Sequence, residues 1–144
     1  VVINEFGDEL HRLQYTHYEV YGIHWHPDGQ RLAFGGEDSK VHIWDLSTGE
    51  TTVLTQHSNH VHGVHWNNDG SRLATGSLDG TVRIFETGQW SETFLFRRTS
   101  AVTAGAWSPN GKQLAAGDDA GQIIIWTADD GSATEPSDPV EVAK

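Results

Sequence analysis

Short apolar segments separated by turn-forming residues recur along the whole chain. The segment VHGVHW (61–66) ends at NNDG (67–70), where Asn, Asp and Gly tolerate the positive φ that hairpin loops require. RLATGS (72–77) follows, and after a tight turn come the β-branched segment TVRIFE (81–86) and the weaker segment ETFLF (92–96). Apolar runs of this length, bounded by turn residues, predict four short antiparallel β-strands.

The four predicted strands belong to a unit that repeats every 41 residues. Trp25, Trp66 and Trp107 are separated by this step. Three copies in one register, without an insertion, predict an all-β fold built from repeated four-stranded sheets. Six further sets of residues follow the same step: Val20, Val61 and Val102; Gly29, Gly70 and Gly111; Leu32, Leu73 and Leu114; Gly35, Gly76 and Gly117; Ile43, Ile84 and Ile125; and Trp44, Phe85 and Trp126.

The repeat resembles the WD40 repeat, whose copies typically run about 40–45 residues and end in Trp-Asp. HIWD (42–45) matches this ending in full, whereas RIFE (83–86) and IIWT (124–127) are relaxed versions of it. The resemblance covers residues 17–127. It implies WD40-type β-propeller blades: about three full four-stranded blades plus partial strands, forming an arc or a portion of a larger propeller.

The repeat register divides the chain into five parts. Residues 1–16 correspond to the outer strands of an upstream blade, and 17–56, 57–97 and 98–127 are WD40 repeats, the third without a clear fourth strand. Two prolines and several acids disfavour an ordered strand in 128–144, which we interpret as an acidic tail or linker. Propellers have about four to eight blades, so we expect further blades, or copies of this chain, to complete a ring.

The second repeat contains the residue types of a nucleophilic triad. The family resemblance instead implies a structural hydrogen-bonded network, which joins a His before the first strand, a Ser or Thr in the second strand, an Asp in the tight turn and the Trp. His57, Thr75 and Asp79 match these positions, and Phe85 stands at the Trp position. No oxyanion-hole or nucleophile-elbow signature accompanies them, so we expect a structural network and no enzymatic activity.

The other repeats match the implied network only in part. The first repeat keeps Asp38 and Trp44 but has Thr16 and Phe34 at the His and Ser/Thr positions. The third repeat keeps only Trp126 and has Arg98, Ala116 and Ala120 at the other three positions. We therefore expect the third blade to be held by packing alone.

The histidines offer a second kind of chemistry. His24 alternates with His26, and His60 with His62, so each pair shares one face of a strand and could chelate a metal ion. A propeller enzyme or a metal-binding propeller that uses channel-facing His24 and His65 is therefore an alternative. The chain has no Cys, and no carboxylate lies at ligand spacing beside these pairs, so we expect neither a metal nor another cofactor.

Net charge narrows the class of partner. Twenty acids against nine Lys and Arg give a formal net charge of −11, which disfavours binding to a phosphate backbone. No segment approaches the roughly 20 apolar residues that span a bilayer, so no membrane is expected. The absence of cysteine fits an intracellular protein of the cytoplasm or nucleus.

These observations predict a non-catalytic scaffold for protein–protein interactions within a larger complex. In this family the loop before the first strand and the turn between the second and third strands share one rim, and partner specificity is expected where rim residues differ between repeats. A self-assembling unit that closes a ring by oligomerisation is the remaining alternative. The candidate rim residues are Tyr18, Asn59, His60, Leu78 and Arg98.

Overall fold

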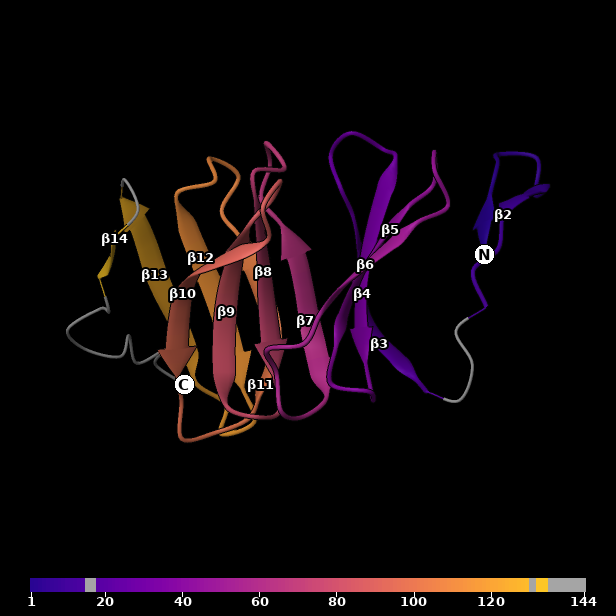
Figure 1. Cartoon of the computed structure of the whole chain (residues 1–144). Coiled ribbons are helices and arrows are strands. Elements are labelled where there is room, and N and C mark those ends of the chain that lie inside the picture. The colour runs from indigo at the N-terminus through magenta and orange to yellow at the C-terminus, as the bar shows by residue number, and fades with distance from the viewer. Residues whose placement is uncertain (15–17, 130–131, 135–144) are drawn as a thin grey trace.

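The protein is a row of antiparallel sheets, as the repeat predicts (Figure 1). The computed structural model describes residues 1–14, 18–129 and 132–134. A two-stranded hairpin is followed by three four-stranded sheets, and each sheet is built from consecutive strands. Among the described residues, there is no helix long and apolar enough to cross a membrane.

Each four-stranded sheet contains one repeat, with its strands in chain order from one edge to the other. The hairpin consists of β1 (Val2–Ile3) and β2 (Glu9–His11). The first sheet consists of β3 (Val20–Trp25), β4 (Arg31–Gly36), β5 (Val41–Asp45) and β6 (Thr51–Leu54). The second consists of β7 (Val61–Trp66), β8 (Arg72–Ser77), β9 (Thr81–Glu86) and β10 (Ser91–Arg97). The third consists of β11 (Val102–Trp107), β12 (Gln113–Asp118), β13 (Ile123–Asp129) and β14 (Ser132–Thr134).

The third sheet differs from the sequence expectation at its outer edge. We expected no ordered fourth strand after Trp126, but β14 pairs antiparallel with β13 from Asp129↔Ser132 to Thr127↔Thr134. Both prolines of this region, Pro136 and Pro139, follow β14, so they remove no backbone donor from the pairing. The rest of the expected tail, residues 135–144, lies outside the described residues.

The sheets pack through their faces, with β3 beside β7 and β7 beside β11. Glycines allow this approach, because a Cβ on Gly35 would lie 2.5 Å from Cγ1 of Val61. At the equivalent position of the next interface, a Cβ on Gly76 would lie 2.8 Å from Cγ1 of Val102. The repeated glycine and valine therefore form the same sheet-to-sheet contact twice.

Each interface between sheets encloses a hydrophobic core. The core between the first and second sheets includes Val41, Ile43 and Trp66, and the core between the second and third includes Val82 and Ile84. These two cores hold the strands in the fixed positions on which the loops at either end of the sheets depend.

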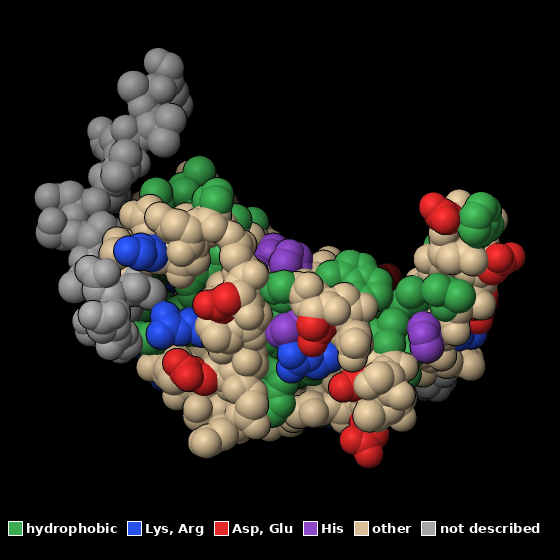
Figure 2. Space-filling view, turned by 90° about the horizontal axis from the view of Figure 1, so that it is seen from above, with side chains coloured by type: hydrophobic (Ala, Val, Ile, Leu, Met, Phe, Trp, Pro, Cys, Tyr) green, Lys and Arg blue, Asp and Glu red, His purple; other side chains and the backbone are tan. Residues whose placement is uncertain are grey.

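The row is curved and has an open face at each end. Seen along the strands, the sheets follow an arc that is hollowed between the hairpin and the first sheet (Figure 2). A pocket of about 440 Å³ lies there, lined by apolar residues that include Ile3, Ile23 and Trp25. At the other end, Ile123 is 57% exposed, whereas its equivalents in the two buried interfaces, Val41 and Val82, are 1% and 2% exposed.

Candidate protein-interaction surface

The structure brings the three polar residues of the second repeat together. His57 precedes β7, Thr75 lies in β8 and Asp79 lies in the turn between β8 and β9. His57 Nδ1 is 3.0 Å from Asp79 Oδ2, and His57 Nε2 is 2.8 Å from Thr75 Oγ1. Because three separate segments of the sheet contribute to it, this network fixes the loop before β7 against the turn that follows β8.

The protonation states of the network follow from its contacts. Burial lowers the pKa of His57, against the opposing effect of the Asp79 carboxylate, so the imidazole is neutral at pH 7. Burial alone would raise the pKa of Asp79, but hydrogen bonds from the Thr81 hydroxyl, the Ser58 N–H and His57 lower it to about 2. His57 Nδ1–H therefore donates to an ionised carboxylate, and its Nε2 accepts from the Thr75 hydroxyl.

The network cannot act as a nucleophilic triad in this arrangement. The Thr75 residue is 1% exposed and the His57 side chain is also 1% exposed, so no substrate reaches the hydroxyl. Thr81, which the sequence analysis did not select, completes the network, because its hydroxyl lies 2.6 Å from Asp79 Oδ1. Thr81 is the first residue of β9 and lies two residues after Asp79 in the chain. A hydroxyl residue at this spacing after the turn aspartate is the sequence feature that could have predicted the contact.

The first repeat contains a different polar pair. Asp38 Oδ2 lies 3.0 Å from Nε2 of His42, which comes from β5 and not from the loop before the first strand. The His42 ring also stacks on Phe34, with ring centroids 5.0 Å apart. Trp44 packs with its edge toward His11 in a small core against the hairpin, and Thr16 lies outside the described residues.

We expected the third blade to be held by packing alone, but the structure shows polar contacts there as well. Arg98 donates to Gln122 Oε1 at 2.7 Å and lies 3.7 Å from the buried Asp118 carboxylate. Asp118 Oδ1 accepts the backbone N–H of both Ala120 and Gln122. Trp126 stacks on Phe96, with centroids 4.6 Å apart. An Arg–Asp pair therefore stands where the second repeat has its histidine network.

The rim loops are joined in pairs by backbone hydrogen bonds. The N–H of Glu37 donates to Glu19 O at 3.0 Å, that of Leu78 to His60 O at 2.9 Å, and that of Asp119 to Ala101 O at 3.0 Å. The loop before the first strand and the turn after the second strand thus lie together at one end of each sheet. Among the candidate rim residues, Tyr18 and Asn59 are exposed and His60, Leu78 and Arg98 are half-buried.

A β-bulge lies beside the rim in the first strand of each four-stranded sheet. The pairing skips Tyr21 in β3, His62 in β7 and Thr103 in β11, which are equivalent positions of the repeat. A bulge turns the extra residue away from the regular alternation of the strand. The sequence analysis did not select Tyr21, whose ring lies 4.4 Å from that of His62 and 5.8 Å from that of His60.

The histidines of β3 and β7 pack against each other across the first interface. The rings of His24 and His65 lie 5.6 Å apart, and His24 Nδ1 accepts the backbone N–H of Trp66. No group of three or more potential metal ligands occurs among the residues described. Burial lowers the pKa of both histidines, that of His65 to about 4, so both are neutral packing groups at pH 7.

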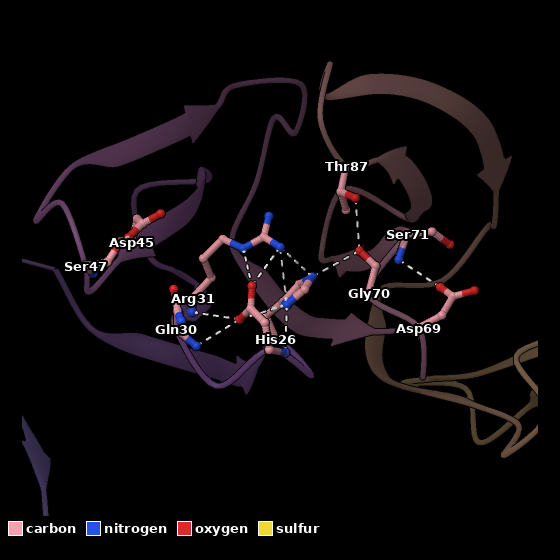
Figure 3. Close-up of polar contacts among 10 residues, drawn as sticks. His26, Gln30, Arg31, Asp45, Ser47, Asp69, Gly70, Ser71 and Thr87 are labelled. Carbon is pink, nitrogen blue, oxygen red and sulfur yellow. Dashed lines mark hydrogen bonds and ion pairs between the residues drawn. The ribbon is translucent and has the colours of Figure 1, made fainter.

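A second polar cluster joins the first and second sheets at the ends opposite the rim (Figure 3). His26 follows β3 and points across the interface, where its Nε2 lies 3.1 Å from Gly70 O. Thr87 Oγ1 donates to the same carbonyl at 2.9 Å. The His26 and Trp66 rings are nearly perpendicular, with centroids 4.5 Å apart, and Arg31 lies over the indole.

The repeated four-stranded sheets, packed face to face along a curve, define a β-propeller built from sequence repeats. A family model described as "Vps42 beta-propeller" matches residues 26–129. The chain belongs to this family of WD40 β-propellers, as the sequence resemblance predicts.

Relatives and solved structures of the same kind match parts of the chain. It is 50% identical over 38 residues to "Cell division cycle 20.1, cofactor of APC complex" of Arabidopsis thaliana, covering 26% of this chain and 8% of that protein. It is 50% identical over 36 residues to "Protein HIR1" of Kluyveromyces lactis, covering 25% of this chain and 4% of that protein.

Two solved structures share the fold over most of the chain. A chain of "Crystal Structure of Mitotic Checkpoint Complex" has a TM-score of 0.75 and 28% identity, over 85% of this chain and 41% of the other. "Structure of U3-55K" has a TM-score of 0.78 and 21% identity, over 85% of this chain and 40% of the other. The chain thus spans about two fifths of these solved chains and less than a tenth of the two curated relatives.

Proposed function

We propose that this protein is a non-catalytic WD40 scaffold that binds partner proteins at its rim within a larger complex. The single observation that carries the proposal concerns the loop before β7 and the turn between β8 and β9. Their interior residues are bonded to one another, whereas their rim residues differ from repeat to repeat. The interior residues His57, Thr75 and Asp79 are buried and bonded to one another. Of the residues beside them on the rim, Asn59 is exposed and Leu78 is half-buried, and both differ from their counterparts in the other repeats.

Leu78 is the most informative of these rim residues. Its equivalents in the first and third repeats are Glu37 and Asp119, so the turn itself does not require an apolar side chain. Its backbone N–H already bonds to His60 O, and this bond does not depend on the side chain. Tyr and Arg are enriched among binding hot spots, and the rim provides one of each in Tyr18 and Arg98.

The relatives are consistent with this role. The names of two relatives describe a cofactor of the APC complex and a subunit of the anaphase-promoting complex, and one similar chain comes from a structure of the mitotic checkpoint complex. We extend to this chain only the general role of a complex subunit. An intracellular location, in the cytoplasm or nucleus, is part of the same proposal.

The proposal is tested by capturing partners with the tagged full-length protein and identifying them by mass spectrometry. The double variant Leu78→Glu with Tyr18→Ala is expected to lose partners while its melting temperature stays within about 1–2 °C of the parent, as is usual for surface changes. Lys112→Glu is the matched control, because it reverses the charge of an exposed residue in a turn at the opposite ends of the sheets. Undiminished capture by the double variant would place the binding surface elsewhere.

A second proposal concerns the open face of the third sheet. Ile123 and Ile125 are 57% and 44% exposed, whereas their equivalents Ile43 and Ile84 are almost fully buried against a neighbouring sheet. We propose that a further propeller blade covers this face in the assembled protein. Assembly from copies of this chain is the alternative, and the molecular mass of the assembly distinguishes the two.

A further inference from the structure

An aromatic and acidic surface lies on the rim at the junction of the first and second sheets. We call it the Tyr21 patch and define it as Tyr21, His60, His62, Glu19 and Glu37. Tyr21 belongs to the bulge of β3, whereas His60 precedes β7 and His62 lies in its bulge. The Tyr21 side chain is 40% exposed although its ring lies 4.4 Å from that of His62. One side of the phenol ring is therefore covered by protein, and the remainder is open to solvent.

Two acidic residues lie beside Tyr21 on the rim: Glu19, two residues before it in the chain, and Glu37, in the turn that bonds to Glu19. The N–H of Glu37 donates to Glu19 O at 3.0 Å, and Glu37 Oε2 accepts the N–H of Glu19 at 3.4 Å, so the two residues are held side by side. Desolvation raises the pKa of Tyr21, and the negative charges of Glu19 and Glu37 raise it further. The field of both carboxylates therefore extends to the Tyr21 hydroxyl.

The negative charge of the patch is not neutralised locally. Among the ion pairs formed within the described ranges, none involves Glu19 or Glu37. Burial and the neighbouring His60 lower the pKa of His62, so this ring carries no positive charge at pH 7. The formal net charge of −11 gives the whole chain the same sign as the patch.

We propose that the Tyr21 patch binds an arginine side chain in a basic segment of a partner protein. This inference rests on the proposed function and names the chemistry of the partner at that rim. A guanidinium group can stack on the exposed face of Tyr21, since aromatic faces attract cations. At the same time it can donate charge-assisted hydrogen bonds to the carboxylates of Glu19 and Glu37.

The repeat provides matched controls for each component of the patch. Thr103 occupies the bulge position of Tyr21 in the third sheet and is also exposed, but it has no ring. Asp119 occupies the turn position of Glu37, is exposed and has the same charge. Substitutions at Thr103 and Asp119 therefore lie at the same positions of the fold as those at Tyr21 and Glu37, but outside the patch. Asp119→Asn changes the net charge by the same amount as Glu37→Gln.

The test measures binding of a fluorescein-labelled peptide of alternating Gly and Arg to the full-length protein by fluorescence anisotropy, in 150 mM salt. A peptide with citrulline in place of Arg keeps the shape and removes the charge. Tyr21→Ala and Glu37→Gln are each expected to weaken binding of the Arg peptide by about three- to tenfold, the range of one cation–π contact or charge-assisted bond. Tyr21→Phe is expected to restore binding to within about twofold, because it retains the ring face.

The controls decide the interpretation. Thr103→Ala and Asp119→Asn are expected to leave the affinity within about twofold, as surface changes outside a binding site do. Equal losses in the Tyr21 patch and control variants would show non-specific attraction to an acidic protein and would overturn the inference. Equal binding of the Arg and citrulline peptides would do the same.

The two proposals can fail separately. If Leu78→Glu with Tyr18→Ala abolishes partner capture while the Arg peptide does not bind the Tyr21 patch, the scaffold function stands and the arginine inference is wrong. If the Arg peptide binds the patch specifically while partner capture is unaffected by the rim double variant, the patch recognises arginine but the proposed partner surface is wrong.

Discussion

The carboxylate of Asp79 holds four neighbouring groups at once. It accepts from His57, from the backbone N–H of Ser58, and from both the hydroxyl and the N–H of Thr81. Removing an acceptor of this kind leaves buried donors without partners, and such donors have lost their hydration as well. Removing the Asp79 side chain therefore breaks four hydrogen bonds of the second repeat at once.

We expect Asp79→Ala to lower the free energy of unfolding by about 1–3 kcal/mol, which is the typical cost of leaving buried donors unpaired. Chemical denaturation of the full-length protein, followed by tryptophan fluorescence, measures this change. Asp119→Ala, at the exposed position just before the third-repeat equivalent of Asp79, is the control and is expected to have little effect. An unchanged unfolding midpoint for Asp79→Ala would contradict a stabilising role for the network.

The same network predicts a loss of stability in acid. The pKa of His57 is lowered from its ordinary value of 6.5, so the unfolded chain takes up this proton at a higher pH than the folded protein, and stability decreases as the pH falls below about 6.5. The pKa of Asp79 is lowered from 3.8 to about 2, so a further loss follows between about pH 4 and pH 2. Melting temperatures between pH 7.5 and pH 2 measure both effects.

His57→Gln separates this effect from that of the other histidines. The variant is expected to be less stable than the parent at pH 7.5, and the difference in melting temperature is expected to shrink as the pH falls toward 5. A constant difference across that range would contradict a neutral His57 in the folded protein.

At the scale of strands and turns, the contact of His26 across the first interface is not repeated by the equivalent residue at the second, where Asn68 of the same turn donates to Pro109 O instead. The repeat equivalents of His26 are Asn67, which bonds within its own sheet to Ser71 and Arg72, and Ser108, which bonds to Asn110 and Gln113. His26 instead reaches Gly70 O in the next sheet, and its ring packs perpendicular to that of Trp66. The junction between the first two sheets therefore depends on one side chain that the repeat does not require.

We expect His26→Ser to weaken this junction by about 1–3 kcal/mol, while the turn keeps the serine that the third repeat already uses. The loss of the ring beside Trp66 should also change the tryptophan emission spectrum of the folded protein. Thermal unfolding together with fluorescence measures both, and Ser108→Ala controls for the turn itself. Unchanged melting with an altered spectrum would mean that the ring contacts Trp66 without stabilising the junction.

The 41-residue repeat predicted these elements because strand periodicity, turn glycines and core positions all recur in register. It could not reveal Tyr21, since a bulge interrupts the alternation without changing the residue types around it. It did not reveal the pairing of Arg98 with Asp118 because Asp118 lies outside the network positions, at the repeat equivalent of Ser77. His42 was missed because it lies in the third strand of its repeat, whereas the network implied by the resemblance has its histidine before the first strand. The contacts that the sequence did not predict are thus those made by residues that differ between repeats.

At the scale of the whole molecule, the two ends of the row present surfaces that the interior of the row buries. Gly35 and Gly76 each receive a valine from the following sheet, whereas a Cβ on the equivalent Gly117 would meet Ala104 of its own sheet no closer than 3.9 Å. Exposed Ile123 and Ile125 lie on the same sheet. Contiguous apolar surface of this kind promotes association in water.

We therefore expect the isolated 144-residue chain to self-associate, which multi-angle light scattering measures. Ile123→Lys with Ile125→Glu is expected to reduce the apparent mass, because it places charges of both signs on the open face without altering net charge. Thr52→Lys with Val53→Glu, on the exposed strand β6, is the control for substitutions that leave this face intact. A monodisperse parent that melts cooperatively as a monomer would contradict the proposal of a missing neighbour.

The arrangement of sheets in a row also determines the order in which they can unfold. In a structure where each unit contacts only its neighbours, stability is a sum of unit and interface contributions. The second sheet has an interface on both sides and the complete histidine network, whereas the third has one interface and the Arg98–Asp118 pair. We therefore expect local opening to begin at the third sheet and move inward, so that the backbone amides of β8 exchange last in a hydrogen-exchange measurement.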